Sequence, residues 1–198
     1  MTSAAPRRGR RPGAPDTRAA ILAAARSLFA SAGYAGTSVR SVAAAAGVDA
    51  ALVHHYFGTK DDLFIAALEL PVDPRVVTRP VIEGGPDGAG ERLMRLFAAV
   101  WDDEHTRTPL LALVRGILEP EGQQLVQDGF LRMVLQPVGA GLGIDDPDRR
   151  LPLVASQLVG IVVLRHVIGL EPLASMSADD LVAVYAPTLQ RYLTGPLP

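Results

Sequence analysis

Apolar residues recur at three- and four-residue spacing along most of the chain, which is the spacing of one face of an α-helix. The first such run is Ile21, Leu22, Ala25, Leu28 and Phe29. Capping residues and glycines divide this part of the chain into predicted helices at about 16–33, 38–46, 49–57 and 59–70. The expected caps of these helices are, in order, Asp16 or Thr17, Thr37 or Ser38, Asp49, and Thr59. No segment shows a sustained alternation of apolar and polar residues, which would predict a β-strand. The pattern therefore predicts an all-α fold.

The remainder of the chain shows longer helical patterns punctuated by proline and glycine. A loop-rich stretch at 83–90 precedes the first of them. The predicted helices lie at about 91–105, 109–118, 121–136, 149–169 and 178–194. Residues 139–148 are predicted to form a turn, because glycines and aspartates gather there.

Composition and charge narrow the class of protein. The chain has 198 residues, 48% of them hydrophobic, which excludes a fully disordered protein. It has no cysteine, so disulfides, thiolate metal sites and cysteine nucleophiles are excluded. Residues 1–60 carry eight basic and two acidic side chains, whereas the rest carries eleven basic and nineteen acidic ones. This asymmetry indicates that only the first part meets a polyanion.

The N-terminal residues 1–15 contain four arginines and almost nothing to bury, so they predict a flexible basic arm. Two interpretations of this arm stay open, a solvated tail and an arm that enters the minor groove of DNA. No secretory signal is expected, because Arg26 interrupts the apolar stretch that follows the arm. The most apolar long segment, 151–170, contains Arg165 and His166, which favours a buried helix over a membrane span. We expect a cytoplasmic protein without a membrane partner.

The segment 37–60 has the pattern of a helix-turn-helix. Gly47 separates two short predicted helices, and a residue without Cβ adopts the positive φ that a sharp turn needs. Val39, Val42, Ala43 and Ala46 form an apolar face on the first helix, and Val48, Val53 and Phe57 face it from the second. In this geometry the second helix is free to enter a DNA major groove.

With Val53 and Phe57 turned inward, the helical period sends the other residues of the second helix outward. The predicted outward set is Ala50, Ala51, Leu52, His54 and His55. Their methyl groups and imidazoles suit thymine methyls, guanine acceptors and phosphates. Helix N-termini bind phosphate through free N–H groups, and here Thr37, Ser38 and Lys60 stand beside them. Arg40 and Tyr56 complete the predicted DNA-contacting set.

The motifs Gly47-Val48, Leu52-Val53-His54-His55-Tyr56-Phe57 and Gly58-Thr59-Lys60-Asp61-Asp62-Leu63 resemble the DNA-binding signature of the TetR family of bacterial repressors. The resemblance implies a homodimer that binds an operator and is released by a small molecule. It places Ala50 and Ala51 at positions that face bases, and His54 where the family often has a phosphate-contacting tyrosine. Asp49 departs from the usual Ser or Thr, which keeps the helix cap but brings a negative charge near phosphate. The implied domains are DNA-binding at 16–70 and ligand-binding and dimerising at 71–198.

Two apolar stripes in the last two predicted helices fit a four-helix dimer interface, as the resemblance implies. The expected interface residues are Leu158, Ile161, Val162, Arg165, Leu181, Val184, Tyr185, Thr188 and Tyr192. The middle helices are expected to line a ligand pocket. Its candidate residues are Phe97, Trp101, His105, Arg115, Phe130, Met133 and His166.

Other chemistry finds little support in the sequence. Gly139-Ala-Gly-Leu-Gly143 imitates a phosphate loop, but no strand precedes it, so it is interpreted as a linker. His54 and His55 point about 100° apart on a helix, which makes them a poor metal pair. We expect no cofactor, no metal and no catalytic residues. Two alternatives remain, a sequence-indifferent DNA-binding protein and a small helical enzyme.

Overall fold

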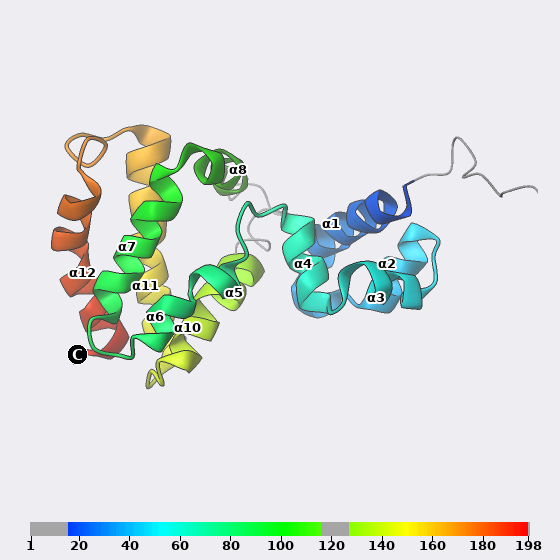
Figure 1. The fold of residues 1–198 in the computed structure, drawn as a ribbon, viewed down its shortest axis with the longest axis horizontal. Coiled ribbons are helices and arrows are strands. Elements are labelled where there is room, and N and C mark those ends of the chain that lie inside the picture. The colour runs from blue at the N-terminus through cyan, green and yellow to red at the C-terminus, as the bar shows by residue number, and fades with distance from the viewer. Residues whose placement is uncertain (1–15, 116–126, 198) are drawn as a thin grey trace, which may run out of the picture.

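The structure is a computed structural model that describes residues 16–115 and 127–197. Figure 1 shows two helical units joined end to end by the segment 69–73, with the N-terminal unit in blue and cyan. The described residues form helices and loops and contain no β-strand, so the predicted all-α fold is confirmed. The basic arm predicted at 1–15 lies outside the described residues.

The N-terminal unit contains α1 Thr17–Gly36, α2 Val39–Ala46, α3 Ala50–Phe57 and α4 Lys60–Leu68. The side chains of Asp16, Ser38, Asp49 and Thr59 accept the capping hydrogen bonds at the four helix starts, in agreement with the sequence. Gly47 has a φ of 67° and a ψ of 33°, so the turn between α2 and α3 uses the left-handed conformation that favours glycine.

The C-terminal unit begins with short helices and ends with long ones. It contains α5 Pro74–Val77, α6 Arg79–Glu83, α7 Ala89–Asp102, α8 Glu104–Arg115, η2 Gln127–Leu135, α10 Gln136–Gly141, α11 Pro147–Ile161, η3 Val162–Ile168 and α12 Ala178–Thr194. η2 and η3 have the wider turns of a π-helix, and η3 continues directly from α11. The structure agrees with the predictions at 149–169 and 178–194 to within about two residues.

Several predicted boundaries in the middle of the chain are wrong. The helix expected at 91–105 ends at Asp102, because Asp103 is extended and a new helix starts at Glu104. Pro109 lies inside α8 instead of starting a helix, and the chain stays helical past Pro137 to Gly141, where a turn was predicted. α5 and α6 were not predicted, although Asp73 followed by Pro74 is a helix-start signal. Residues 116–126 lie outside the described residues.

Each unit has its own hydrophobic core. In the N-terminal core, Phe29, Tyr34 and Phe64 pack with ring centroids 4.8–6.0 Å apart. Met133 of η2 belongs to this N-terminal core, although η2 is otherwise part of the C-terminal unit. η2 is therefore packed against both units.

In the C-terminal unit, α7 and α12 approach each other closely at Gly90. A Cβ on Gly90 would lie 2.5 Å from the carbonyl oxygen of Ala186 and 2.5 Å from the backbone nitrogen of Gln190. The Gly90 N–H donates to Oε1 of Gln190 over 2.8 Å. The contact between the two helices therefore depends on the absence of a side chain at this position.

Candidate functional site

α3 presents one face to solvent and one to the core. Val53 and Phe57 are buried, at 1% and 8% exposure, in the N-terminal core, where α3 packs against α2 and α4. The solvent side carries Ala51, Leu52, His54, His55 and Tyr56, as the helical period predicts. Ala50 is half-buried and packs against the N-terminal core, so it is less outward than predicted. Short side chains at the start of α3 leave its backbone accessible to a large partner.

His54 is oriented by the turn that follows α3. Its Nδ1 lies 2.8 Å from the carbonyl oxygen of Gly58. Because a carbonyl only accepts hydrogen bonds, Nδ1 donates and Nε2 is the ring nitrogen that is left for an external contact. At the other end of the helix, the Asp49 carboxylate accepts from the Ala51 N–H over 2.7 Å and acts as the cap.

Thr37 does not belong to the solvent face, which corrects the sequence-based assignment of its side chain to DNA. The residue is 2% exposed, and its hydroxyl donates to the carbonyl oxygens of Leu28 and Gly33 over 3.0 and 2.8 Å. The hydroxyl therefore stabilises the end of α1. Ser38 and Arg40 are exposed, and Ser38 forms a reciprocal capping box with Ser41 at the start of α2.

Lys60 lies beside an aromatic ring that also contacts the C-terminal unit. Its Nζ is 4.0 Å from the ring centroid of Tyr34, and the guanidinium of Arg132, on η2, is 4.1 Å from the same centroid. The Tyr34 hydroxyl donates to the Asp61 carboxylate. Burial raises the pKa of Tyr34, and the nearby Asp61 carboxylate adds to this rise. η2 therefore reaches the N-terminal unit through a polar contact as well as through Met133.

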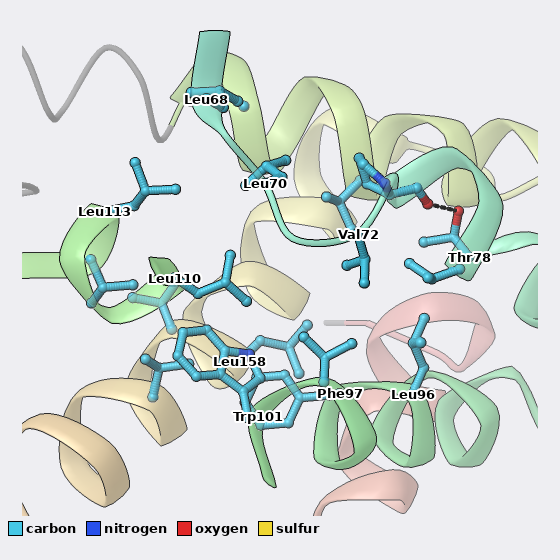
Figure 2. A pocket seen from close by; sticks show the side chains of 18 of the residues that line it. Leu68, Leu70, Val72, Thr78, Leu96, Phe97, Trp101, Leu110, Leu113 and Leu158 are labelled. Atoms are coloured by element: carbon cyan, nitrogen blue, oxygen red, sulfur yellow. Dashed lines mark hydrogen bonds between the residues drawn. The ribbon is translucent and has the colours of Figure 1, made fainter. Parts of the chain in front are cut away.

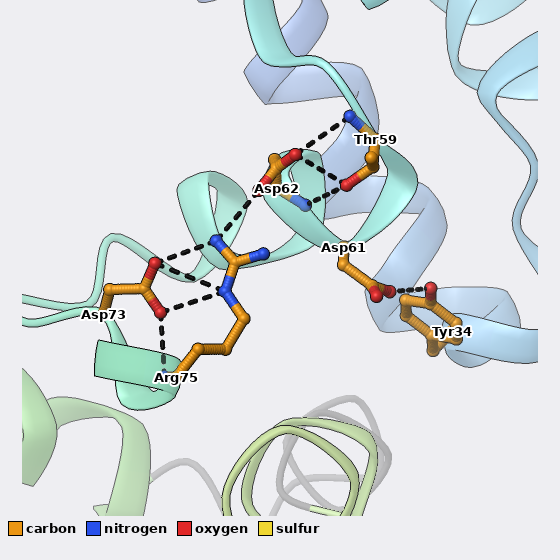
Figure 3. Close-up of polar contacts among 6 residues, drawn as sticks. All are labelled: Tyr34, Thr59, Asp61, Asp62, Asp73 and Arg75. Atoms are coloured by element: carbon orange, nitrogen blue, oxygen red, sulfur yellow. Dashed lines mark hydrogen bonds and ion pairs between the residues drawn. The ribbon is translucent and has the colours of Figure 1, made fainter. Parts of the chain in front are cut away.

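A second polar contact connects α4 to α5 across the segment between the two units. One Nη of Arg75 lies 2.8 Å from an Asp62 oxygen and 2.8 Å from an Asp73 oxygen (Figure 3). The Thr59 hydroxyl and backbone N–H also donate to Asp62, over 2.6 and 3.0 Å. These bonds, with the Thr59 hydroxyl as the largest cause, lower the pKa of Asp62 to about 2. The sequence predicted the Thr59 cap. It did not predict the contact of Arg75 with Asp62, because Arg75 lies in α5, a helix that was not expected.

A cavity of about 210 Å³ lies where this connecting segment meets the C-terminal helices. In Figure 2, Leu70 and Val72 face Phe97 and Trp101 across it. Its lining residues are Leu68, Leu70, Val72, Pro74, Val77, Thr78, Leu93, Leu96, Phe97, Val100, Trp101, Leu110, Leu113, Val114, Gly129, Val134, Leu158, Val159 and Val162. The wall thus includes the end of α4, which belongs to the N-terminal unit, the segment that leaves this unit, and η2, which packs against it.

The structure brings only part of the predicted ligand set to this cavity. Phe97 and Trp101 line it, whereas His105 and Arg115 are exposed and lie outside its lining. Met133 is buried in the N-terminal core instead. The side chain of Phe130 lies outside what the structure describes.

His166, the remaining member of the predicted ligand set, does not line the cavity. It stacks on Trp101 with ring centroids 5.5 Å apart. Burial is the main cause that lowers the pKa of His166.

The predicted dimer residues differ in how much of each side chain is exposed. Leu158, Ile161, Val162 and Leu181 are at most 3% exposed in the single chain, so these four are core residues and the interface assignment is wrong for them. Tyr185, Thr188 and Tyr192 are half-buried. Arg165 donates to the carbonyl oxygens of Leu173 and Met176 over 2.8 and 2.7 Å. Val184 is the one predicted interface residue whose side chain faces solvent, at 58% exposure.

Other apolar side chains at the end of the α11–η3 helix and in the loop after it face solvent. They are Leu164, Val167, Ile168 and Leu170, with exposures from 37% to 62%. Leu164 and Val167 were not among the expected interface residues, because the wider turns of η3 shift the helical period that was used to assign faces.

Two family models match the chain. The model described as "Bacterial regulatory proteins, tetR family" matches residues 21–67, which include the helix-turn-helix. The model described as "Tetracyclin repressor-like, C-terminal domain" matches residues 87–193. The second match alone covers more than half of the chain and contains most of the cavity wall.

Individual relatives are also regulators. The HTH-type transcriptional repressor Rv3405c of Mycobacterium tuberculosis is 38% identical over 98 residues, which cover 38% of this chain and 52% of the relative. HbdR of Aromatoleum, an HTH-type transcriptional regulator, is 29% identical over 125 residues, which cover 59% of this chain and 52% of the relative. The chain thus spans about half the length of the curated relatives it matches.

Among solved structures, a TetR-family regulator (SCO0857) from Streptomyces coelicolor is 39% identical. The match covers 93% of this chain and 98% of that one, with a TM-score of 0.46. The family models and the relatives agree on a class of transcriptional regulators and not of enzymes. The chain belongs to the TetR family of bacterial regulatory proteins.

Proposed function

We propose that the chain is a homodimeric transcriptional repressor that binds a pseudo-palindromic operator and is released by a small molecule. Residues 16–70 bind DNA, and residues 71–198 bind the effector and form the dimer. The observation that carries the proposal is that one segment of the chain belongs both to the cavity wall and to the connection between the two units. The same segment that closes the cavity, Leu68 to Val72, also connects the two units of the chain.

DNA binding rests on the exposed side of α3 and its surroundings. His54, His55 and Tyr56 offer polar groups to the major groove and its phosphates, and Ala51 and Leu52 offer methyl groups. Ser38, Arg40 and Lys60 supply phosphate contacts near the starts of α2 and α4. In a dimer, two copies of α3 about 34–36 Å apart would read successive major grooves.

Dimer formation rests on the large apolar side chains that face solvent within 164–170, namely Leu164, Val167, Ile168 and Leu170, and on the exposed Val184 of α12. Exposed apolar side chains that gather in one segment are typical of an interaction site. Within the described residues, Pro147–Ile168 is long and apolar enough to span a membrane, and 28% of its most apolar window is buried. We propose that a second copy of the chain covers the exposed end of this helix. We place the protein in the cytoplasm, where its operator is found.

Release by an effector rests on contacts between the cavity wall and the N-terminal unit. Gly129 and Val134 of η2 line the cavity, while Arg132 and Met133 of the same helix contact the N-terminal unit. A ligand that shifts η2 or the connecting segment changes the position of α3 relative to its copy in the dimer. It thereby favours the population that no longer fits the operator.

The test is selection of bound sites from a random duplex library by the purified protein at about 0.15 M salt. We expect an enriched inverted repeat with half-sites one or more helical turns apart. His55→Ala should weaken binding to the selected site by roughly 5- to 30-fold, whereas the matched control His105→Ala, on exposed α8, should not change it. Retention of DNA without any enriched sequence would contradict the proposal and favour sequence-indifferent binding.

A further inference from the structure

The cavity wall is almost entirely hydrocarbon. Among the described residues that line it, none carries an ionisable side chain, and only Thr78 and Trp101 have a polar side-chain atom. The Thr78 hydroxyl already donates to the carbonyl oxygen of Pro74 over 2.7 Å. The indole N–H of Trp101 has no acceptor among the described residues, so the described part of the wall leaves this donor for a ligand.

The size of the cavity limits the size of the ligand. A cavity of roughly 150 Å³ with an aliphatic and aromatic lining holds one benzene ring. At about 210 Å³ this cavity is larger by less than a half. It therefore suits a compact molecule of about eight to ten non-hydrogen atoms, such as one substituted ring or two fused rings.

The ionisable groups around Trp101 lie outside the described lining of the cavity. The Arg165 guanidinium lies 3.4 Å from the Asp102 carboxylate and donates to two backbone carbonyls. Arg107 donates to the backbone carbonyl oxygen of Trp101 over 3.4 Å. His166 stacks on Trp101, and its buried Nε2 has no hydrogen-bond partner among the described residues. Burial lowers the pKa of His166, which favours its uncharged ring. An ion in this cavity would lose its hydration without gaining a counter-charge from the described wall. The free-energy cost of this desolvation exceeds the free energy gained by burying one ring.

We propose that the effector is an uncharged, mainly apolar compound of this size, with at most one hydrogen-bond acceptor, which Trp101 recognises through its indole N–H. This inference rests on the proposed effector role of the cavity. It excludes organic cations and carboxylates as effectors of this chain.

Trp101 also supplies the measurement, because it is the single tryptophan of the chain. The whole chain, without DNA, is titrated at pH 7 with cyclohexylmethanol, cyclohexylmethylammonium and cyclohexanecarboxylate. Trp101 fluorescence and the heat of binding are recorded. These probes share one ring and differ in charge. We expect the alcohol to bind and to shift the emission of Trp101, and the two ions to bind roughly 100-fold more weakly or not at all. Equal or tighter binding of either ion, or no binding of the alcohol, would overturn the proposal.

Two neighbouring valines locate the site. Val77 lines the cavity, whereas Val76 is 58% exposed and lies outside the lining. Val77→Phe should fill part of the cavity and weaken the binding of cyclohexylmethanol by at least about tenfold, while Val76→Phe should leave it unchanged. Equal binding by both variants would place the probe elsewhere and overturn the proposal. Thermal unfolding of both variants verifies that each is folded.

The two proposals fail in distinguishable ways. Probe binding is measured without DNA, so a negative result there leaves the selection of an operator unaffected. An absent operator, conversely, leaves the binding of the alcohol as a measured property of the cavity.

Discussion

Replacing Thr37 by valine separates a structural role of this residue from a role in DNA binding. Valine keeps the shape of the side chain but removes a hydroxyl that donates to the carbonyl oxygens of Leu28 and Gly33. The residue is 2% exposed, so water does not replace the lost bonds. A buried acceptor without its partner costs about 1–3 kcal/mol, and the Leu28 carbonyl keeps a long contact with the Ser31 hydroxyl, so we expect a loss of about 1–2 kcal/mol.

For a chain of this size, that loss lowers the unfolding midpoint by roughly 2–8 °C. Thermal unfolding measures it, and fluorescence anisotropy with the selected duplex measures affinity at several salt concentrations. Thr37→Val should keep wild-type affinity while folded. The control, Arg40→Ala, should keep the midpoint and lower the salt slope by about 1. A variant Thr37→Val with an unchanged midpoint and a tenfold loss of affinity would show that the hydroxyl acts on DNA.

Three further predictions follow from the geometry. Gly90→Ala should destabilise the C-terminal unit by about 1–3 kcal/mol, since its Cβ would meet the backbone of α12 at 2.5 Å. The control Gly160→Ala should be neutral or stabilising, because a Cβ at Gly160 would have no atom within 4 Å beyond the neighbouring backbone of its own helix. Urea unfolding measures both variants, and equal effects on stability would contradict the close approach of α7 and α12 at Gly90. The pKa of Asp62 is lowered from 3.8 to about 2, so its stabilisation is complete well above pH 4 and is lost as the pH falls through about 2. Because its side chain is 35% exposed, Asp62→Asn should cost only about 1 kcal/mol at pH 7. This difference from wild type should shrink as the pH falls below 4 and disappear below about 2, and a difference that does not change with pH would refute the assignment. Ile168→Glu and Val184→Glu should convert the dimer to monomers in sedimentation experiments, and an unchanged mass would place the interface elsewhere.

The sequence predicted the N-terminal unit well because its signals are local. Asp16, Ser38, Asp49 and Thr59 cap the helices that they were expected to cap, and glycine supplies the turn. In the C-terminal unit, proline was interpreted as a boundary, but tertiary packing keeps α8 helical through Pro109 and continues the chain past Pro137. A local sequence pattern contains little information on tertiary packing. The predicted helix boundaries in the middle of the chain were wrong for that reason.

The candidate sites divide in a similar way. The outward residues of α3 follow from the helical period, and Phe97 and Trp101 were correctly expected near a cavity. Neither Arg75 nor Arg132 was expected to make contacts between segments, because nothing in their immediate neighbours indicates a distant partner. The sequence also provided no reason to expect the connecting segment in the cavity wall, since that depends on how two separate units dock.

The position of Leu70 and Val72 has a consequence for the evolution of such a regulator. These residues belong both to the wall of the cavity and to the covalent connection between the units. Under the proposed effector role of the cavity, a substitution there changes both which compound is recognised and how strongly recognition is transmitted. Under the same proposal, we expect substitutions at Leu96 or Val159, on the opposite helices, to alter recognition alone. New specificities with an intact response should therefore arise first from the α7 and α11 side of the cavity.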